Sequence, residues 1–263
     1  MSTVIFNTDV GAGLFSNINR IVTYLVNNPD TKKIVWSMTG QESGCMGYDT
    51  NNKELFSLLF EQFSEISDSD VTAVNVSTRW MEDSNITGYN VINYYLYREE
   101  LRPYSNSFHT FLKFRPELNR QIELVKNALF HDTNDVVAII VRGDALKDEQ
   151  PRRKMPTRQE YINVIRKLPD NNKRKYFLCI DNEDDLQFFK SILPNHYHTN
   201  IRRSTTKNDI EPHKKTRGTE KDFYDSFLEV VYCSLCNILI HPVTNMATAS
   251  LYMNMNQISV PII

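Results

Sequence analysis

The sequence predicts an α/β protein built from two halves, each with a parallel sheet covered by helices. Apolar runs of about four to eight residues alternate along the chain with amphipathic stretches, which is the pattern of strands interleaved with helices. The 263 residues suit one large domain or two small ones, at about 100–200 residues per domain. With 41% hydrophobic residues, 14 Phe and 13 Tyr, the composition supplies a substantial core and excludes a disordered chain.

The first half begins with a strand, a glycine turn and a helix. Residues 4–6 form a short apolar run, residues 11–13 (Gly-Ala-Gly) break it, and residues 17–27 carry apolar side chains at helical spacing. The next predicted elements are a strand, a helix and a strand, at residues 33–38, 54–63 and 72–76. From 90 to 130 the pattern is helical almost throughout, and Pro116 stands where a helix would begin.

A second alternation of strands and helices follows residue 134. Apolar runs predict buried strands at residues 136–141, 175–180 and 237–242, and amphipathic stretches predict helices at 157–168 and 184–193. Thr157 is the expected cap of the first of these helices, with Glu160 at the capping-box position, and a further helix begins near Thr244. Residues 202–218 are basic and lack periodicity, which favours a solvated loop.

We place the junction of the two halves near residues 130–135, so the predicted domains are 1–131 and 132–263. Thirty Lys and Arg against 32 Asp and Glu leave no global positive charge for nucleic acid or an anionic membrane. No apolar run reaches the ~20 residues of a membrane span, and the N-terminus lacks a signal-peptide pattern, so we expect a cytoplasmic protein. The four cysteines are too few and too scattered for a disulfide framework, so we expect reduced residues in the core. The pattern carries no signal for an oligomeric state.

Polar residues and glycines follow the predicted strands, at the edge where open α/β sheets bind ligands. The candidates are Asp9, Gly11, Ala12, Gly13 and Asn17 after the first strand, Arg142 and Asp144 after the fourth, Asp181 after the fifth, and Thr244, Asn245 and Met246 after the last.

These residue types suit a nucleoside diphosphate. A glycine turn that opens a helix offers backbone N–H groups to phosphate, and Arg142 adds a permanently charged, planar fork. Asp181 can accept from a ribose or a base, and Thr244 adds a hydroxyl and amides at a helix start. A structural role stays open for each: an ordinary turn for the glycines and Arg142, a cap for Thr244. Their coincidence favours a nucleotide-diphosphate site between the halves.

Several segments, in order, resemble motifs of the fucosyltransferase-type glycosyltransferases. Residues 114–118 (FRPEL), a helix and residues 137–144 (VAIIVRGD) resemble the family's helix and the strand ending in H-x-R. Residues 176–182 (YFLCIDN) resemble its strand ending in T-D or S-D. Residues 232–245 resemble the strand that leads to a Ser-containing helix start, and residues 11–17 resemble the G-x-G-N-Q loop. Ile140 replaces the motif's His, and the Gln of the glycine loop is absent.

The resemblance implies the GT-B fold, with two Rossmann-like domains and a cleft between them. Residues 1–131 would form the acceptor side, and 132–263 would bind the nucleotide sugar. It implies an inverting, metal-independent transfer to a glycan hydroxyl, from GDP-fucose as the family default or from UDP-xylose or another donor as a variant. Arg142 would then neutralise the leaving diphosphate, Asp181 would lie near the nucleoside, and Thr244 and Asn245 would face the phosphates.

An inverting transfer needs a base for the acceptor hydroxyl. Asp9, beside the glycine turn, is the candidate, and Glu42 and Asp49, in the polar loop after the second strand, are reserves and candidate acceptor-binding residues. Ile140 in place of His keeps an alternative open: a catalytically degenerate protein of the same fold that binds a nucleotide or carbohydrate. We expect no metal: the D-x-D at residues 68–70 precedes a strand and is interpreted as a turn, and Cys233-x-x-Cys236 lacks a second pair.

Overall fold

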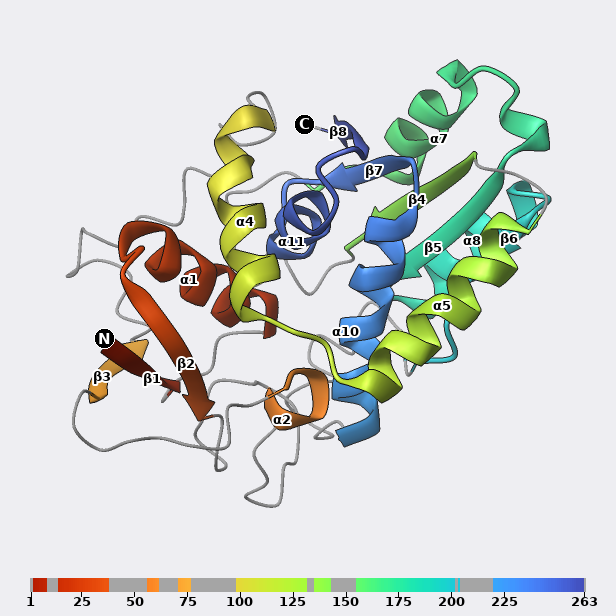
Figure 1. The fold of residues 1–263 in the computed structure, drawn as a ribbon. Helices are drawn as coiled ribbons and strands as arrows, with labels where there is room; N and C mark the ends of the chain where they lie inside the picture. Colours follow the sequence, from red (N-terminus) through yellow and green to blue (C-terminus); the bar gives the residue numbers. More distant parts are fainter. Residues whose placement is uncertain are drawn as a thin grey trace.

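The chain forms two parallel sheets with helices around and between them, which confirms the predicted α/β class (Figure 1). The computed structural model describes residues 2–8, 14–37, 56–61, 71–76, 98–131, 135–142, 155–201, 203 and 220–262. The smaller sheet has the strand order β2-β1-β3, and the larger has the order β6-β5-β4-β7-β8. Both orders place the first strand of the sheet between strands that come later in the sequence.

The smaller sheet belongs to the first half of the chain. Its central strand β1 (Ser2–Thr8) pairs in parallel with β2 (Thr31–Ser37) and with β3 (Val71–Val76). Helix α1 (Leu14–Asn27) joins β1 to β2 and begins before the predicted residue 17. A stripe of fully buried residues on α1 repeats at helical spacing and faces the core: Ile18, Ile21, Val22 and Leu25.

Helices α4 and α5 follow the smaller sheet. A 3₁₀ turn η2 (Arg98–Leu101) leads into α4 (Arg102–Phe111), and α5 (Pro116–Phe130) begins at the predicted proline. The prediction of a helix through residue 63 is wrong, because helix α2 (Phe56–Leu59) gives way to an antiparallel bridge between Phe60 and Phe114.

The larger sheet is built from the second half. Its strands are β4 (Val136–Val141), β5 (Lys175–Ile180), β6 (His196–Tyr197), β7 (Ile238–Pro242) and β8 (Ile258–Ile262), all parallel. The chain runs outward from β4 through β5 to β6, then returns to the other side of β4 for β7 and β8. This reversal creates a switch point between β4 and β7, where helices leave the sheet in opposite directions and ligands characteristically bind.

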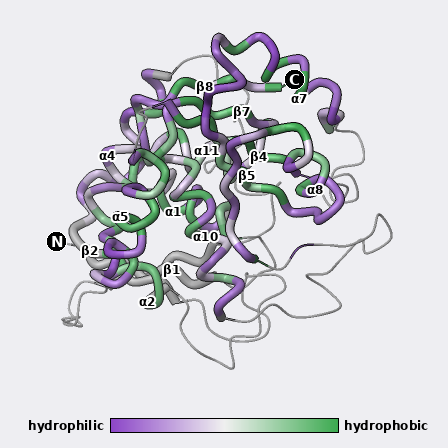
Figure 2. The backbone as a smooth tube through the Cα atoms, turned by 90° about the vertical axis from the view of Figure 1, so that its right-hand side faces the viewer, coloured by the Kyte–Doolittle hydropathy of each residue, from purple (hydrophilic) through white to green (hydrophobic). Residues whose placement is uncertain are grey.

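Helices cover both faces of the larger sheet. One face packs on α5, α10 (Glu220–Leu235) and α11 (Asn245–Met253), and the other on α7 (Arg158–Lys167) and α8 (Glu183–Ile192). Alternate residues of β4 therefore enter different clusters: Ala138 and Ile140 pack toward α10 and α11, whereas Ile139 and Val141 pack toward α7 and α8. Burial on both faces of the sheet explains why β4 consists of apolar residues throughout, whereas α5 mixes apolar and polar residues (Figure 2).

One hydrophobic cluster extends from the larger sheet to α1 and α4. The ring of Phe15 stacks on that of Phe227 at a centroid distance of 5.9 Å, and the ring of Phe108 lies 5.3 Å from that of Tyr252. In Figure 1, α4 and α11 lie between the two sheets. The two halves thus share a core, and their division into domains at residue 131 stays a prediction.

Candidate functional site

Three strands of the larger sheet bring predicted site residues to its carboxyl edge. The register pairs Val141 of β4 with Ile180 of β5, so Arg142 and Asp181 are the next residues on neighbouring strands. Strand β7 lies on the other side of β4 and leads through Thr244 into α11. Arg142 therefore stands at the switch point of the sheet, with Asp181 on one side and the start of α11 on the other.

The guanidinium of Arg142 contacts both neighbours. Its Nε lies 3.5 Å from Oδ2 of Asp181, and its Nη1 donates to Sδ of Met246 over 3.4 Å. The side chains of Arg142 and Asp181 are 23% and 19% exposed, so the ion pair is partly open to solvent. A thioether is a weak acceptor, and an anionic oxygen that reached this position would bind the guanidinium more strongly.

The start of α11 is fixed by Thr244, as predicted. Its Oγ1 accepts from the N–H of Ala247 over 3.2 Å, and its carbonyl accepts from Oγ1 of Thr248 over 3.1 Å. The first turn of α11 holds no acidic residue, so the positive end of the helix dipole is not neutralised by its own side chains. Together with Arg142, this helix start forms a positively charged edge suited to phosphate oxygens.

Asn245 joins the two halves of the molecule. Nδ2 of Asn19, on α1, donates to the carbonyl and to Oδ1 of Asn245 over 3.1 and 3.2 Å. The hydroxyl of Tyr252 donates to Oδ1 of Asn19 over 2.8 Å. Asn17, like Asn19, lies in α1, and it is 1% exposed. Asn19, which no local sequence pattern singles out, connects α1 to the start of α11.

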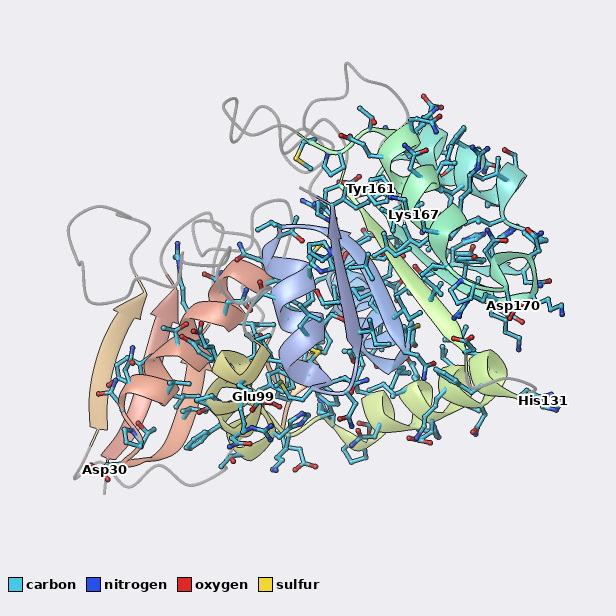
Figure 3. The ribbon with its side chains drawn as sticks, turned by 90° about the horizontal axis from the view of Figure 1, so that it is seen from above. Asp30, Glu99, His131, Tyr161, Lys167 and Asp170 are labelled. Carbon is cyan, nitrogen blue, oxygen red and sulfur yellow. The ribbon has the colours of Figure 1, made fainter. Side chains whose placement is uncertain are left out.

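Tyr161 supports the end of β4 and was also overlooked. Its hydroxyl donates to the carbonyl of Ile140 over 2.9 Å. Burial, with a smaller contribution from the Asp181 and Asp185 carboxylates, raises the pKa of Tyr161, so the phenol stays a neutral donor. Figure 3 places Tyr161 toward one end of the larger sheet and Asp170 toward the opposite end. The side chain of Ile140 is fully buried in the cluster that includes α10 and α11.

The acidic residues after Asp181 serve helix α8. Asn182 caps this helix by accepting from the N–H of Asp185 over 3.2 Å, and the carboxylate of Asp185 lies 2.5 Å from Nε of Arg158. Three acids in the first turn of α8 complement its dipole.

Some predicted site residues lie outside the described residues and stay predictions. They are Asp9, Gly11, Ala12, Gly13, Glu42, Asp49 and Asp144. The D-x-D at residues 68–70 also lies outside them.

Arg203 contradicts, at its own position, the prediction of a solvated loop over residues 202–218; residues 202 and 204–218 lie outside the described residues. Its side chain is 3% exposed and pairs with Glu229 of α10, whose side chain is equally buried.

Cys179, Cys233 and Cys236 are free and buried, which confirms core roles for these three cysteines. Within the described ranges, no group of three or more potential metal ligands lies together. None of the helices described has both the length and the apolar character to cross a membrane.

An open hollow of about 580 Å³ lies away from Arg142, against α4 and its turn to α5. Its polar lining is already engaged, because Nζ of Lys113 donates to the carbonyl of His109 and Nε2 of His109 lies 3.0 Å from the carbonyl of Met253. Its lining also includes Glu61 but no arginine, so the hollow lacks the guanidinium that the edge at Arg142 can offer to a phosphate.

No protein-family model matches the sequence, and no curated protein matches it. Solved structures with the same fold include NodZ α-1,6-fucosyltransferase soaked with GDP-fucose, with a TM-score of 0.57, 11% identity, and 97% of this chain and 93% of that chain covered. NodZ from Bradyrhizobium gives a TM-score of 0.55 at 12% identity, over 96% and 92% of the two chains. POFUT1 in its apo-form gives 0.51 at 7% identity, over 99% and 97%. The chain thus has a fucosyltransferase-like GT-B fold, as the order of motifs implied.

Proposed function

We propose that this protein is a glycosyltransferase that moves a sugar from a nucleoside-diphosphate donor to a glycan hydroxyl. The observation that carries the proposal is the position of Arg142 at the switch point, between Asp181 and the start of α11. This combination of a permanent cation and a capped helix N-terminus suits a diphosphate. The fold of NodZ, which has been crystallised with GDP and soaked with GDP-fucose, supports the same donor class.

In the proposed reaction, the acceptor oxygen attacks the anomeric carbon, and the bond from that carbon to the diphosphate oxygen breaks. Negative charge grows on the departing diphosphate, and Arg142 and the N–H groups of α11 stabilise it more in the transition state than in the ground state. A guanidinium has five N–H donors, so Arg142 can keep Asp181 near Nε while a phosphate oxygen replaces Met246 at Nη1.

We propose that the transfer inverts the anomeric centre and needs no metal, with GDP-fucose as the first donor to test and UDP-xylose as the variant. Asp9, which follows β1, is the proposed base, with Glu42 and Asp49 on the acceptor side. Gly11, Ala12, Gly13, Asn17 and Asp144 complete the proposed donor site.

The test is a titration of the protein with GDP and with UDP, with and without Mg²⁺, followed by calorimetry and a transfer assay. Arg142→Ala should weaken nucleotide binding about 100-fold and abolish transfer, because a charge-assisted contact to the leaving group is lost. Arg158→Ala is the matched control: it removes an arginine that pairs with Asp185 and should leave binding unchanged. Equal affinity of the wild type and Arg142→Ala would refute this site.

The alternative is a binding protein of the same fold that has lost catalysis. The observation that favours it is the fully buried Ile140 at the position where the resembled motif has His. Tight, Arg142-dependent nucleotide binding without transfer or hydrolysis of any sugar conjugate would support this alternative.

A further inference from the structure

Among the described residues, the carboxyl end of β5 has a strand neighbour only on the side of β4. Strand β4 pairs with β5 along its whole length, but β6 pairs only with Tyr176 and Phe177. The N–H of Tyr176 donates to the carbonyl of Asn195, on the side of β5 that faces β6. Backbone groups of every second residue of a strand point to the same side, so the N–H and carbonyl of Ile180, four residues later, also point to this side. Since Ile180 is 1% exposed, its carbonyl needs a partner from another part of the chain.

Arg203 supplies that partner. Its Nε donates to the carbonyl of Ile180 over 2.9 Å, its Nη2 donates to the carbonyl of Thr199 over 2.9 Å, and its Nη1 donates to the carbonyl of Ile201 over 3.1 Å. One buried guanidinium thus ties the segment after β6 to the last residue of β5.

Glu229 of α10 completes the network. Its Oε1 accepts from Nη2 of Arg203 over 3.1 Å and from the hydroxyl of Thr199, and its Oε2 accepts from Sγ of Cys179 over 3.7 Å. The carboxylate therefore contacts β5 as well as the segment that carries Arg203. The network links three elements directly beneath the edge that holds Arg142.

We propose that Arg203 and Glu229 are positioning residues of the donor site: they fix the end of β5 so that the Asp181 carboxylate meets Arg142. Asp181 is the residue after Ile180, so the carbonyl held by Arg203 belongs to the peptide bond that leads directly into Asp181. The inference rests on the proposed function and specifies how its site is held.

A purely stabilising role would not require this chemistry. Replacing a buried ion pair by apolar residues of similar size is often neutral or stabilising, because the charges no longer have to be desolvated. Apolar residues could fill the same space, but they could not donate to the carbonyl of Ile180. Only Arg203 can donate to this carbonyl and so fix the backbone geometry at Asp181.

The test uses the full chain and the double variant Arg203→Met/Glu229→Leu, which removes both charges together and leaves neither unpaired. Its affinity for GDP and UDP should fall about tenfold, because small displacements of a binding group are costly. The matched control is Arg174→Met, at the opposite end of β5, where Nε of Arg174 donates to the carbonyl of Pro169 over 2.8 Å. The control should keep wild-type affinity. Arg203→Lys, which keeps the charge but lacks the planar fork, serves if the double variant does not fold, and should also weaken binding.

A thermodynamic cycle with Asp181→Asn separates positioning from general structural damage. If the network acts through Asp181, then adding Arg203→Met/Glu229→Leu to Asp181→Asn should cause little further loss of nucleotide affinity. Additive losses, or wild-type affinity in both the double variant and Arg203→Lys, would overturn the inference and leave the proposed function intact. If the wild type binds neither GDP nor UDP, the proposed function fails, and the inference fails with it.

Discussion

Two arginines hold the two ends of β5, and they do so in different surroundings. At the amino end, Arg174 pairs with Asp135, whose side chain is 50% exposed. At the carboxyl end, Arg203 pairs with Glu229, and both side chains are 3% exposed. Both arginines are thus largely buried, and the two ends differ in the carboxylate, which is half-exposed at the amino end and buried in the core at the carboxyl end. A desolvated ion pair is costly to form and demands accurate geometry, so its place beneath Arg142 marks the edge where the backbone must be held rigidly.

The largest difference between the two ends should appear when one partner of each pair is removed. Glu229→Ala leaves the Arg203 charge buried and should cost about 3–5 kcal/mol of unfolding free energy. Asp135→Ala removes a half-exposed carboxylate and should cost at most about 1 kcal/mol, because an ion pair with a solvated partner contributes little to stability. Urea denaturation of the two variants measures both values, and similar costs would mean that burial does not distinguish the two ends.

We expect stability to depend on pH, by an intermediate amount, through Glu229 at the carboxyl end of β5. Burial raises the pKa of Glu229 to about 7, against the opposing effects of Thr199, Arg203 and Cys179, while the Asp181 carboxylate raises it further. Between pH 4.5, the ordinary pKa of this group, and about 7, the folded protein holds a proton that the unfolded chain has lost. The contribution of Glu229 to stability therefore falls as pH rises through this window, by up to about 1.4 kcal/mol per pH unit.

His241 acts in the opposite direction. Burial lowers its pKa from 6.5 to about 4, so between these values the unfolded chain holds the proton and stability rises with pH. The two slopes oppose each other below pH 6.5. Glu229→Gln removes one of them, so the difference in unfolding free energy between the wild type and this variant should fall steadily from pH 4.5 to 7. A difference that is constant over this range would show that Glu229 titrates normally.

The smallest expected effects concern two helix caps. Thr244→Ala and Thr157→Ala each remove a side-chain bond to a helix N–H and should each cost about 1 kcal/mol. Only Thr244 lies beside Arg142 in the proposed donor site, so only its replacement should also weaken GDP or UDP binding in calorimetry. Equal nucleotide affinities of the two variants would show that the start of α11 is not part of the donor site.

Features that depend on residues close together in the sequence could be predicted. The strands β4, β5 and β7 were predicted within one residue, because burial on both faces forces a continuous apolar run. The caps at Thr157 and Thr244 were found because capping depends on neighbours three residues away.

Features that depend on distant partners were missed. Arg203 lies in a basic stretch, and nothing near it in the sequence indicates that Glu229, 26 residues later, would pair with it. Asn19 and Asn245 are 226 residues apart, so their contact leaves no local pattern. The sequence pattern gave no bounds for helix α10, although its buried Phe227 and Glu229 belong to the core and to the network beneath the site.

The core shared by α1, α4, α10 and α11 has a practical consequence for dissecting the protein. Cutting the chain at residue 131 would separate Phe108 from Tyr252 and Phe15 from Phe227, and would leave a wide apolar face on each fragment. Such faces cause aggregation in water. Residues 132–263 therefore cannot be excised as a free-standing module, whereas the two fragments produced together should reassemble through this same surface.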